Sequence, residues 1–173
     1  MNNAANSAAN NAADSTADNT IEIPKFGELL AEHLGGVPAE AYPYLLSQLE
    51  RTAAARYRGW AEDVPSHREG IMQCAEREDE IANRVEAMFP PSDEHRALVA
   101  EIIPKAKATY YSAFEPYTPI EQMTIQANAE RQGANAWQTL KAAYPDLADE
   151  LDQLSQIELS SADYLDAALP EMT

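Results

Sequence analysis

The chain has little of several residue types, and each shortage excludes a class of protein. Cys74 is the single cysteine among 173 residues, which excludes an internal disulfide and a cysteine-built zinc or iron–sulfur site. Basic residues number 12 against 29 acidic ones, and a net charge of −17 disfavours contact with nucleic acids and anionic membranes. No stretch approaches the ~18 apolar residues of a membrane-spanning helix. The N-terminus also lacks the basic start and apolar segment of a secretion signal. We therefore expect a cytoplasmic protein with no nucleic-acid and no membrane partner.

Common catalytic motifs are absent as well. The sequence has no glycine-rich phosphate loop, no Gly-x-Ser-x-Gly and no metalloprotease helix motif. Residues 1–20 are an Asn/Ala/Ser/Asp tract with no aromatic residue, and such a segment buries too little apolar surface to offset its ordering entropy. We predict three parts: a disordered N-terminal tail over 1–20, a helical bundle domain over 21–145, and a C-terminal helical segment over 146–173 that docks on the bundle.

Apolar residues recur at helical spacing through most of the chain, and prolines mark the ends of the helices. Short connections between long helices predict an antiparallel four-helix bundle of the all-α class. A short helix over 25–34 precedes it, and the acidic stretch 146–169 is interpreted as one or two short helices. Ser66, with Glu69 in a capping-box pattern, is a predicted N-cap. Ser92 or Asp93 is predicted to cap the helix over 92–115, and Thr118 the helix over 118–144. No strand and no internal repeat are visible. The four main helices are predicted over 38–62, 66–89, 92–115 and 118–144.

Two glutamates interrupt the apolar stripes of these helices. Glu78 lies in the middle of the stripe of 66–89, and Glu130 is near the centre of the stripe of 118–144. Glu50 lies at the edge of its stripe, where partial burial is expected. Each is close to the midpoint of its helix, and midpoints of similar helices lie at one level in a bundle. We therefore predict that Glu50, Glu78 and Glu130 converge in the core.

Two interpretations of these carboxylates stay open. Side-chain oxygens from several helices at one level can hold a pair of metal ions. Alternatively, the acids form a structural polar network with Gln126, tyrosines or flanking arginines, Tyr57 and Tyr110 being at about the same level. In the absence of a metal, at least one of the grouped carboxylates would hold a proton.

The region 38–144 resembles the ferritin-like superfamily. The resemblance rests on Glu50, on Glu78 in CAEREDEIANRVEAMF and on Glu130 in NAERQGANAW. It implies a bundle that holds iron or manganese for redox chemistry, with these three glutamates as ligands. The sequence departs from that family because Ile81 and Gly133 stand where its Glu-x-x-His motifs have histidine.

Two functions are therefore expected from the sequence. The first is a non-catalytic or degenerate ferritin-like protein that acts as an interaction or structural module, with a protein partner or as a homo-oligomer. The missing histidines and the exposed apolar residues of the C-terminal segment motivate it. The alternative is a carboxylate-bridged iron or manganese redox protein. Whether the chain is an enzyme stays open.

Overall fold

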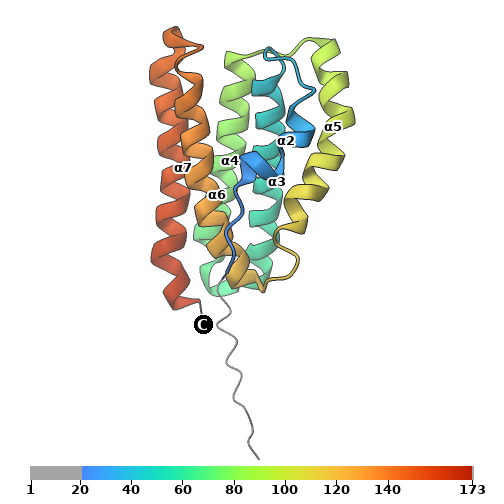
Figure 1. Ribbon diagram of the computed structural model, residues 1–173. Helices are drawn as coiled ribbons and strands as arrows, with labels where there is room; N and C mark the ends of the chain where they lie inside the picture. Colours follow the sequence, from blue (N-terminus) through green and yellow to red (C-terminus); the bar gives the residue numbers. More distant parts are fainter. Residues whose placement is uncertain (1–20, 173) are drawn as a thin grey trace, which may run out of the picture.

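A computed structural model describes residues 21–172, so the predicted disordered tail over 1–20 lies outside the described residues. The described chain is all helical and contains no strand, as the sequence predicts (Figure 1). None of its helices is long and apolar enough to cross a membrane. Its α-helices are α1 (Phe26–Leu29), α2 (Ala31–Leu34), α3 (Tyr42–Asp63), α4 (Arg68–Met88), α5 (Asp93–Ser112), α6 (Pro119–Leu140) and α7 (Ala148–Ala168).

Two helical hairpins make up most of the structure. α3 packs along α4 and α6 packs along α7, and α4 joins the hairpins by packing against α7. α5 connects the hairpins and lies beside α3, on the side away from α7 (Figure 1). The short helices α1 and α2 contact α5, and α1 also contacts α6.

The C-terminal segment differs from its prediction. It docks on the other helices, but as the single 21-residue helix α7 and not as one or two short helices. Its leucines explain the difference, because Leu151, Leu154 and Leu165 are fully buried along one stripe. The helix that lies apart from α7 is α5, which we predicted to be one of the four main helices.

The two hairpins are related by a structural repeat of 80 residues, which corrects the expectation that the chain has none. α4 and α7 have 21 residues each and begin at positions 68 and 148. The 3-10 turns before them begin at Pro65 and Pro145. The ion pair between Arg51 and Glu86 has an equivalent 80 residues later, between Arg131 and Asp166. Few residues are identical between the hairpins, so the repeat is easily missed in the sequence alone.

Helix starts follow their predicted caps at two of three places. Of the two candidates Ser92 and Asp93, Ser92 is the N-cap, and its side chain accepts a hydrogen bond from the backbone N–H of His95. Thr118 is the N-cap of α6 and forms a capping box with Glu121. Ser66 is not an N-cap. It lies inside the 3-10 turn 65–67, which excludes the extended backbone that a capping residue needs.

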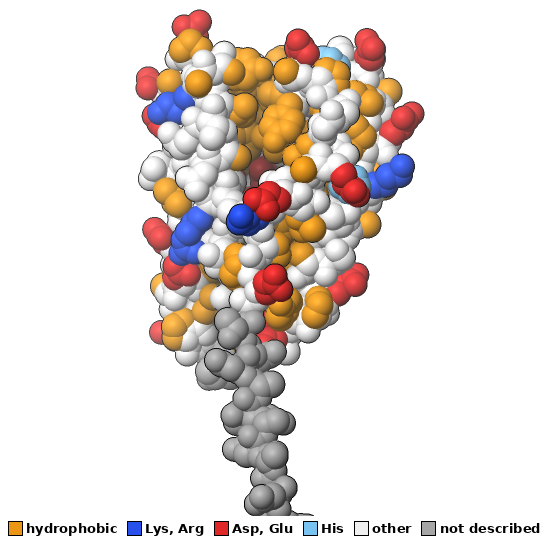
Figure 2. Space-filling view, viewed as in Figure 1, with side chains coloured by type: hydrophobic (Ala, Val, Ile, Leu, Met, Phe, Trp, Pro, Cys, Tyr) orange, Lys and Arg blue, Asp and Glu red, His pale blue; other side chains and the backbone are white. Residues whose placement is uncertain are grey.

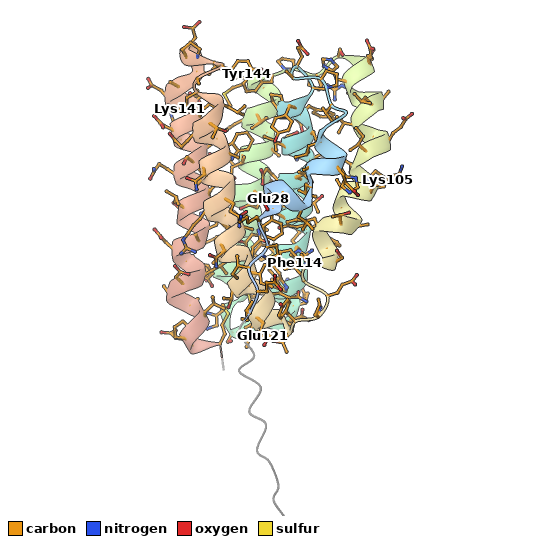
Figure 3. All side chains as sticks on the ribbon, viewed as in Figure 1. Glu28, Lys105, Phe114, Glu121, Lys141 and Tyr144 are labelled. Atoms are coloured by element: carbon orange, nitrogen blue, oxygen red, sulfur yellow. The ribbon has the colours of Figure 1, made fainter. Side chains whose placement is uncertain are left out.

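Acidic side chains are spread over the face shown in Figure 2, and basic ones are fewer there. The apolar core below this surface is divided into two clusters. The larger contains Phe114, and Tyr144 packs against the smaller one near the other end of the helices (Figure 3). On α4, Cys74 belongs to the larger cluster and Ile81 to the smaller. A layer of polar side chains, including Glu78, lies between them.

Candidate metal centre

Four glutamates, one from each helix of the two hairpins, form the polar layer. α3 supplies Glu50, α4 supplies Glu78, α6 supplies Glu130 and α7 supplies Glu158. The side chains of Glu78, Glu130 and Glu158 are only 1–2% exposed, and Glu50 is partly exposed. The predicted convergence of Glu50, Glu78 and Glu130 is therefore seen, with a fourth acid that the sequence analysis missed.

Three of these acids could share one ion. One carboxylate oxygen from each of Glu50, Glu78 and Glu158 lies within 4.8 Å of the other two. Glu130 lies beside this group, and its negative charge raises the pKa of each of the three acids. The structure thus places Glu158 in the closest group of oxygens and Glu130 beside it.

Neutral donors hold two of the carboxylates in place. Glu130 Oε1 accepts hydrogen bonds from the Tyr57 hydroxyl at 2.7 Å and from Gln126 Nε2 at 2.6 Å. The Tyr110 hydroxyl donates to Gln126 Oε1 at 2.7 Å, which fixes the orientation of that amide. Tyr57, Tyr110 and Gln126 were predicted as members of a polar network. Their hydrogen bonds around Glu130 confirm that part of the prediction.

Glu158 has a different set of contacts. Trp137 Nε1 donates to Glu158 Oε1 at 2.7 Å. Gly133 stands directly over this carboxylate, and a Cβ at position 133 would lie 2.7 Å from Glu158 Oε1. Gly133 occupies the position at which a Glu-x-x-His motif would have histidine, and here it leaves room for an acid from α7.

No cation neutralises the four acids within residues 21–172. None of the ion pairs of the described chain includes Glu50, Glu78, Glu130 or Glu158. Glu78 Oε2 and Glu130 Oε2 are buried and receive no hydrogen bond from a described donor. Buried carboxylate oxygens are rarely left without a partner, so these two oxygens need a proton on a neighbouring carboxyl group or a cation.

Burial and mutual repulsion shift the ionisation of the layer. Burial, together with the charge of Glu130, raises the pKa of Glu50 from 4.5 to about 8. Burial and the neighbouring carboxylates also raise the pKa values of Glu78 and Glu158 well above the usual range. Two ionised carboxylates 4.8 Å apart repel by about 3 kcal/mol at an effective dielectric constant of ~20. Three such pairs approach the whole stability of a domain, roughly 5–15 kcal/mol, so the layer needs protons or cations.

No family model, curated protein or solved structure matches this chain. The interpretation of the layer therefore rests on its own geometry.

The histidines do not join the layer. His33 Nε2 contacts the Thr109 hydroxyl at 2.8 Å, on the side of α5. His67 and His95 stand at the starts of α4 and α5, away from the midpoints of the helices. Among the described residues, the donor set is made of carboxylate oxygens.

Glu158 carried a signal that the sequence analysis did not use. The dipeptide Glu-Arg at 50–51 recurs at 130–131, and the shift of 80 residues carries Glu78 onto Glu158. The same shift carries Pro65 onto Pro145. A comparison of the sequence with itself at this shift would have predicted the fourth acid.

Proposed function

We propose that this chain binds a pair of divalent metal ions, iron or manganese, between Glu50, Glu78, Glu130 and Glu158. The observation that carries the proposal is a layer of four acids, three of them buried, with no cation among the described residues and with two buried carboxylate oxygens that receive no hydrogen bond from a described donor. Two divalent cations carry four positive charges, which balance four carboxylates.

The donor atoms narrow the choice of ion. Carboxylate oxygens are hard ligands of the kind that magnesium, calcium and manganese use, and carboxylate-rich sites at one level of a helical bundle hold pairs of iron or manganese ions. Bound iron or manganese would supply one-electron redox chemistry. The chain's own residues hold and orient the ligands: Tyr57 and Gln126 fix Glu130, and Trp137 fixes Glu158. Such contacts behind the ligands set their orientation and basicity.

The proposal includes a ferritin-like arrangement. α3, α4, α6 and α7 would form the antiparallel four-helix bundle, with α5 as the long connection between the hairpins. The support is that each of these four helices contributes one acid at a single level, and that bundle proteins place carboxylate-held metals there. The four helices differ from those that the sequence analysis selected.

The expected role as an interaction module has lost part of its motivation. It depended on the missing histidines and on exposed apolar residues in the C-terminal segment, and Leu151, Leu154 and Leu165 of α7 are buried within the chain. Ile120 on α6 is the one exposed large apolar side chain among the described residues. The absence of histidine from the carboxylate layer, among the described residues, remains the argument for that role.

Metal removal and return test the proposal. Protein treated with a chelator and then supplied with Mn²⁺ or anaerobic Fe²⁺ is expected to unfold at a higher temperature, because an ion that binds only the folded state stabilises it. The variant Glu78→Gln keeps the shape of the side chain and is expected to lose this gain. Glu76→Gln, an exposed residue on the same helix, is the matched control and should retain it. Equal thermal shifts in both variants would place binding at surface acids and reject the proposal.

A further inference from the structure

A pocket opens on one side of the carboxylate layer. It encloses about 170 Å³, and Glu50, Glu130 and Glu158 are among its lining residues. Figure 2 shows a hollow in this face, with hydrophobic side chains on its walls and an acidic side chain at its floor. α1 and α2 supply one wall through Phe26, Leu30 and Leu34.

The walls of the pocket are mostly apolar. Besides those three residues, they are made of side chains from α3, namely Leu46, Leu49 and Ala53, and of small residues from α6, namely Ala129, Gly133 and Ala136. A dry cavity of about 150 Å³ lined by aliphatic and aromatic groups accommodates a molecule the size of benzene. The volume therefore suits a hydrocarbon body of about six carbon atoms.

The amide groups that line the pocket already have partners. Gln126 accepts from Tyr110 and donates to Glu130. Gln132 Oε1 accepts from the Phe26 N–H at 2.8 Å, and its Nε2 donates to the Pro24 carbonyl at 2.9 Å. Each amide therefore has its oxygen and one N–H engaged, which fixes its orientation.

Of the two tyrosines among the described lining residues, Tyr110 already donates its proton to Gln126, which leaves Tyr42. Its hydroxyl makes no hydrogen bond within residues 21–172, and its half-buried side chain lines the pocket. It can donate to one oxygen of a ligand.

Charge excludes one class of ligand. No Lys, Arg or His is among the described residues that line the pocket, while three glutamates are. A carboxylate, phosphate or sulfate group in the ligand would meet acids and no counter-charge.

We propose that this pocket binds a small uncharged molecule that has a hydrocarbon body of about six carbons and one hydroxyl or carbonyl oxygen, which the Tyr42 hydroxyl recognises. The binding site does not need a metal. Its role as the substrate side of the carboxylate layer rests on the function proposed above.

Binding to the chelator-treated full chain tests the proposal, with 1-butanol, 1-pentanol and 1-hexanol as probes in calorimetric titrations. Each added CH₂ group is expected to tighten the Kd about fourfold, as burial of about 0.8 kcal/mol per CH₂ implies. Hexanoate, which has the same length and a negative charge, should bind at least tenfold more weakly than 1-hexanol. Equal binding of hexanoate, or no dependence on chain length, would overturn the proposal.

Variants locate the binding. Ala136→Leu fills the pocket and is expected to weaken 1-hexanol binding at least tenfold, whereas Ala55→Leu, at an exposed position of α3, should leave it unchanged. Tyr42→Phe should weaken 1-hexanol by a factor of about three to ten and leave benzene binding unchanged, with Tyr44→Phe as its control. Melting curves show which variants are folded. Unchanged affinity in folded Ala136→Leu would reject the site, and unchanged affinity in Tyr42→Phe would reject the proposed contact.

These measurements separate the two proposals. Alcohol binding to metal-free protein, without any gain in stability from Mn²⁺, would support the pocket and reject the metal centre. A gain in stability from Mn²⁺ without alcohol binding would support the metal centre and reject the pocket.

Discussion

The stability of the metal-free protein should fall as the pH rises, and Glu50 allows the size of the effect to be worked out. Its pKa is raised from 4.5 to about 8 by burial and by the charge of Glu130. Between these values the folded protein holds a proton that the unfolded chain has released. Folding then takes up a proton, so each pH unit lowers the free energy of unfolding by up to about 1.4 kcal/mol.

This slope predicts a loss of up to about 2.7 kcal/mol between pH 5.5 and 7.5, and at most about 5 kcal/mol over the whole range from 4.5 to about 8. These are upper values, because the Glu50 side chain is partly exposed. Glu78 and Glu158, whose pKa values are also raised, add to the loss in the same direction.

The assay is urea unfolding of chelator-treated wild type and Glu50→Gln at several pH values. The variant has no carboxyl group at position 50, so its stability relative to wild type should increase by up to about 2.7 kcal/mol from pH 5.5 to 7.5. Glu76→Gln removes an exposed acid of α4 and is the control, and its stability relative to wild type should change by less than about 1 kcal/mol over this range. If the difference between Glu50→Gln and wild type stays constant or shrinks as the pH rises, the account of the layer is wrong.

Two further predictions concern the contacts of the layer. Gly133→Ala places a methyl group against the Glu158 carboxylate and should weaken Mn²⁺ binding about tenfold. The control is Gly59→Ala, whose Cβ would meet nothing within 4 Å; it should keep the Mn²⁺ affinity and gain up to ~1 kcal/mol in stability. Equal Mn²⁺ affinities of the two variants in titrations would contradict this prediction. Tyr57→Phe removes a hydrogen bond to Glu130 Oε1 and should destabilise the metal-free protein by about 1–2 kcal/mol in urea, and an unchanged midpoint would contradict the role of this bond.

The sequence predicts the layer in part, for a physical reason that can be named. Glu78 and Glu130 stand at the centres of apolar stripes, and a buried acid on a core face is a signal that needs no structure. Glu50 was placed at the edge of its stripe, and its side chain is indeed partly exposed, yet its carboxylate lies within the layer. Helical spacing shows which face a residue occupies but not how far a flexible side chain reaches.

Helix pairing was harder to predict. α5 and α7 have similar lengths, and both carry apolar residues at helical spacing. Nothing within either helix alone shows which one packs against the hairpin of α3 and α4. Long-range packing decides it: α5 has few buried residues, whereas the stripe of α7 is buried along its whole length. Because 146–169 was interpreted as short helices and not as one long helix of the bundle, Glu158 was not recognised as an acid at the level of the other three.

A crystal structure of the protein soaked with Mn²⁺ tests the central claim most directly, with anomalous scattering recorded at the manganese edge. The account predicts two peaks in the buried layer, within coordinating distance of carboxylate oxygens of Glu50, Glu78, Glu130 and Glu158. Absence of anomalous density between these side chains, with peaks only at surface acids, would contradict it.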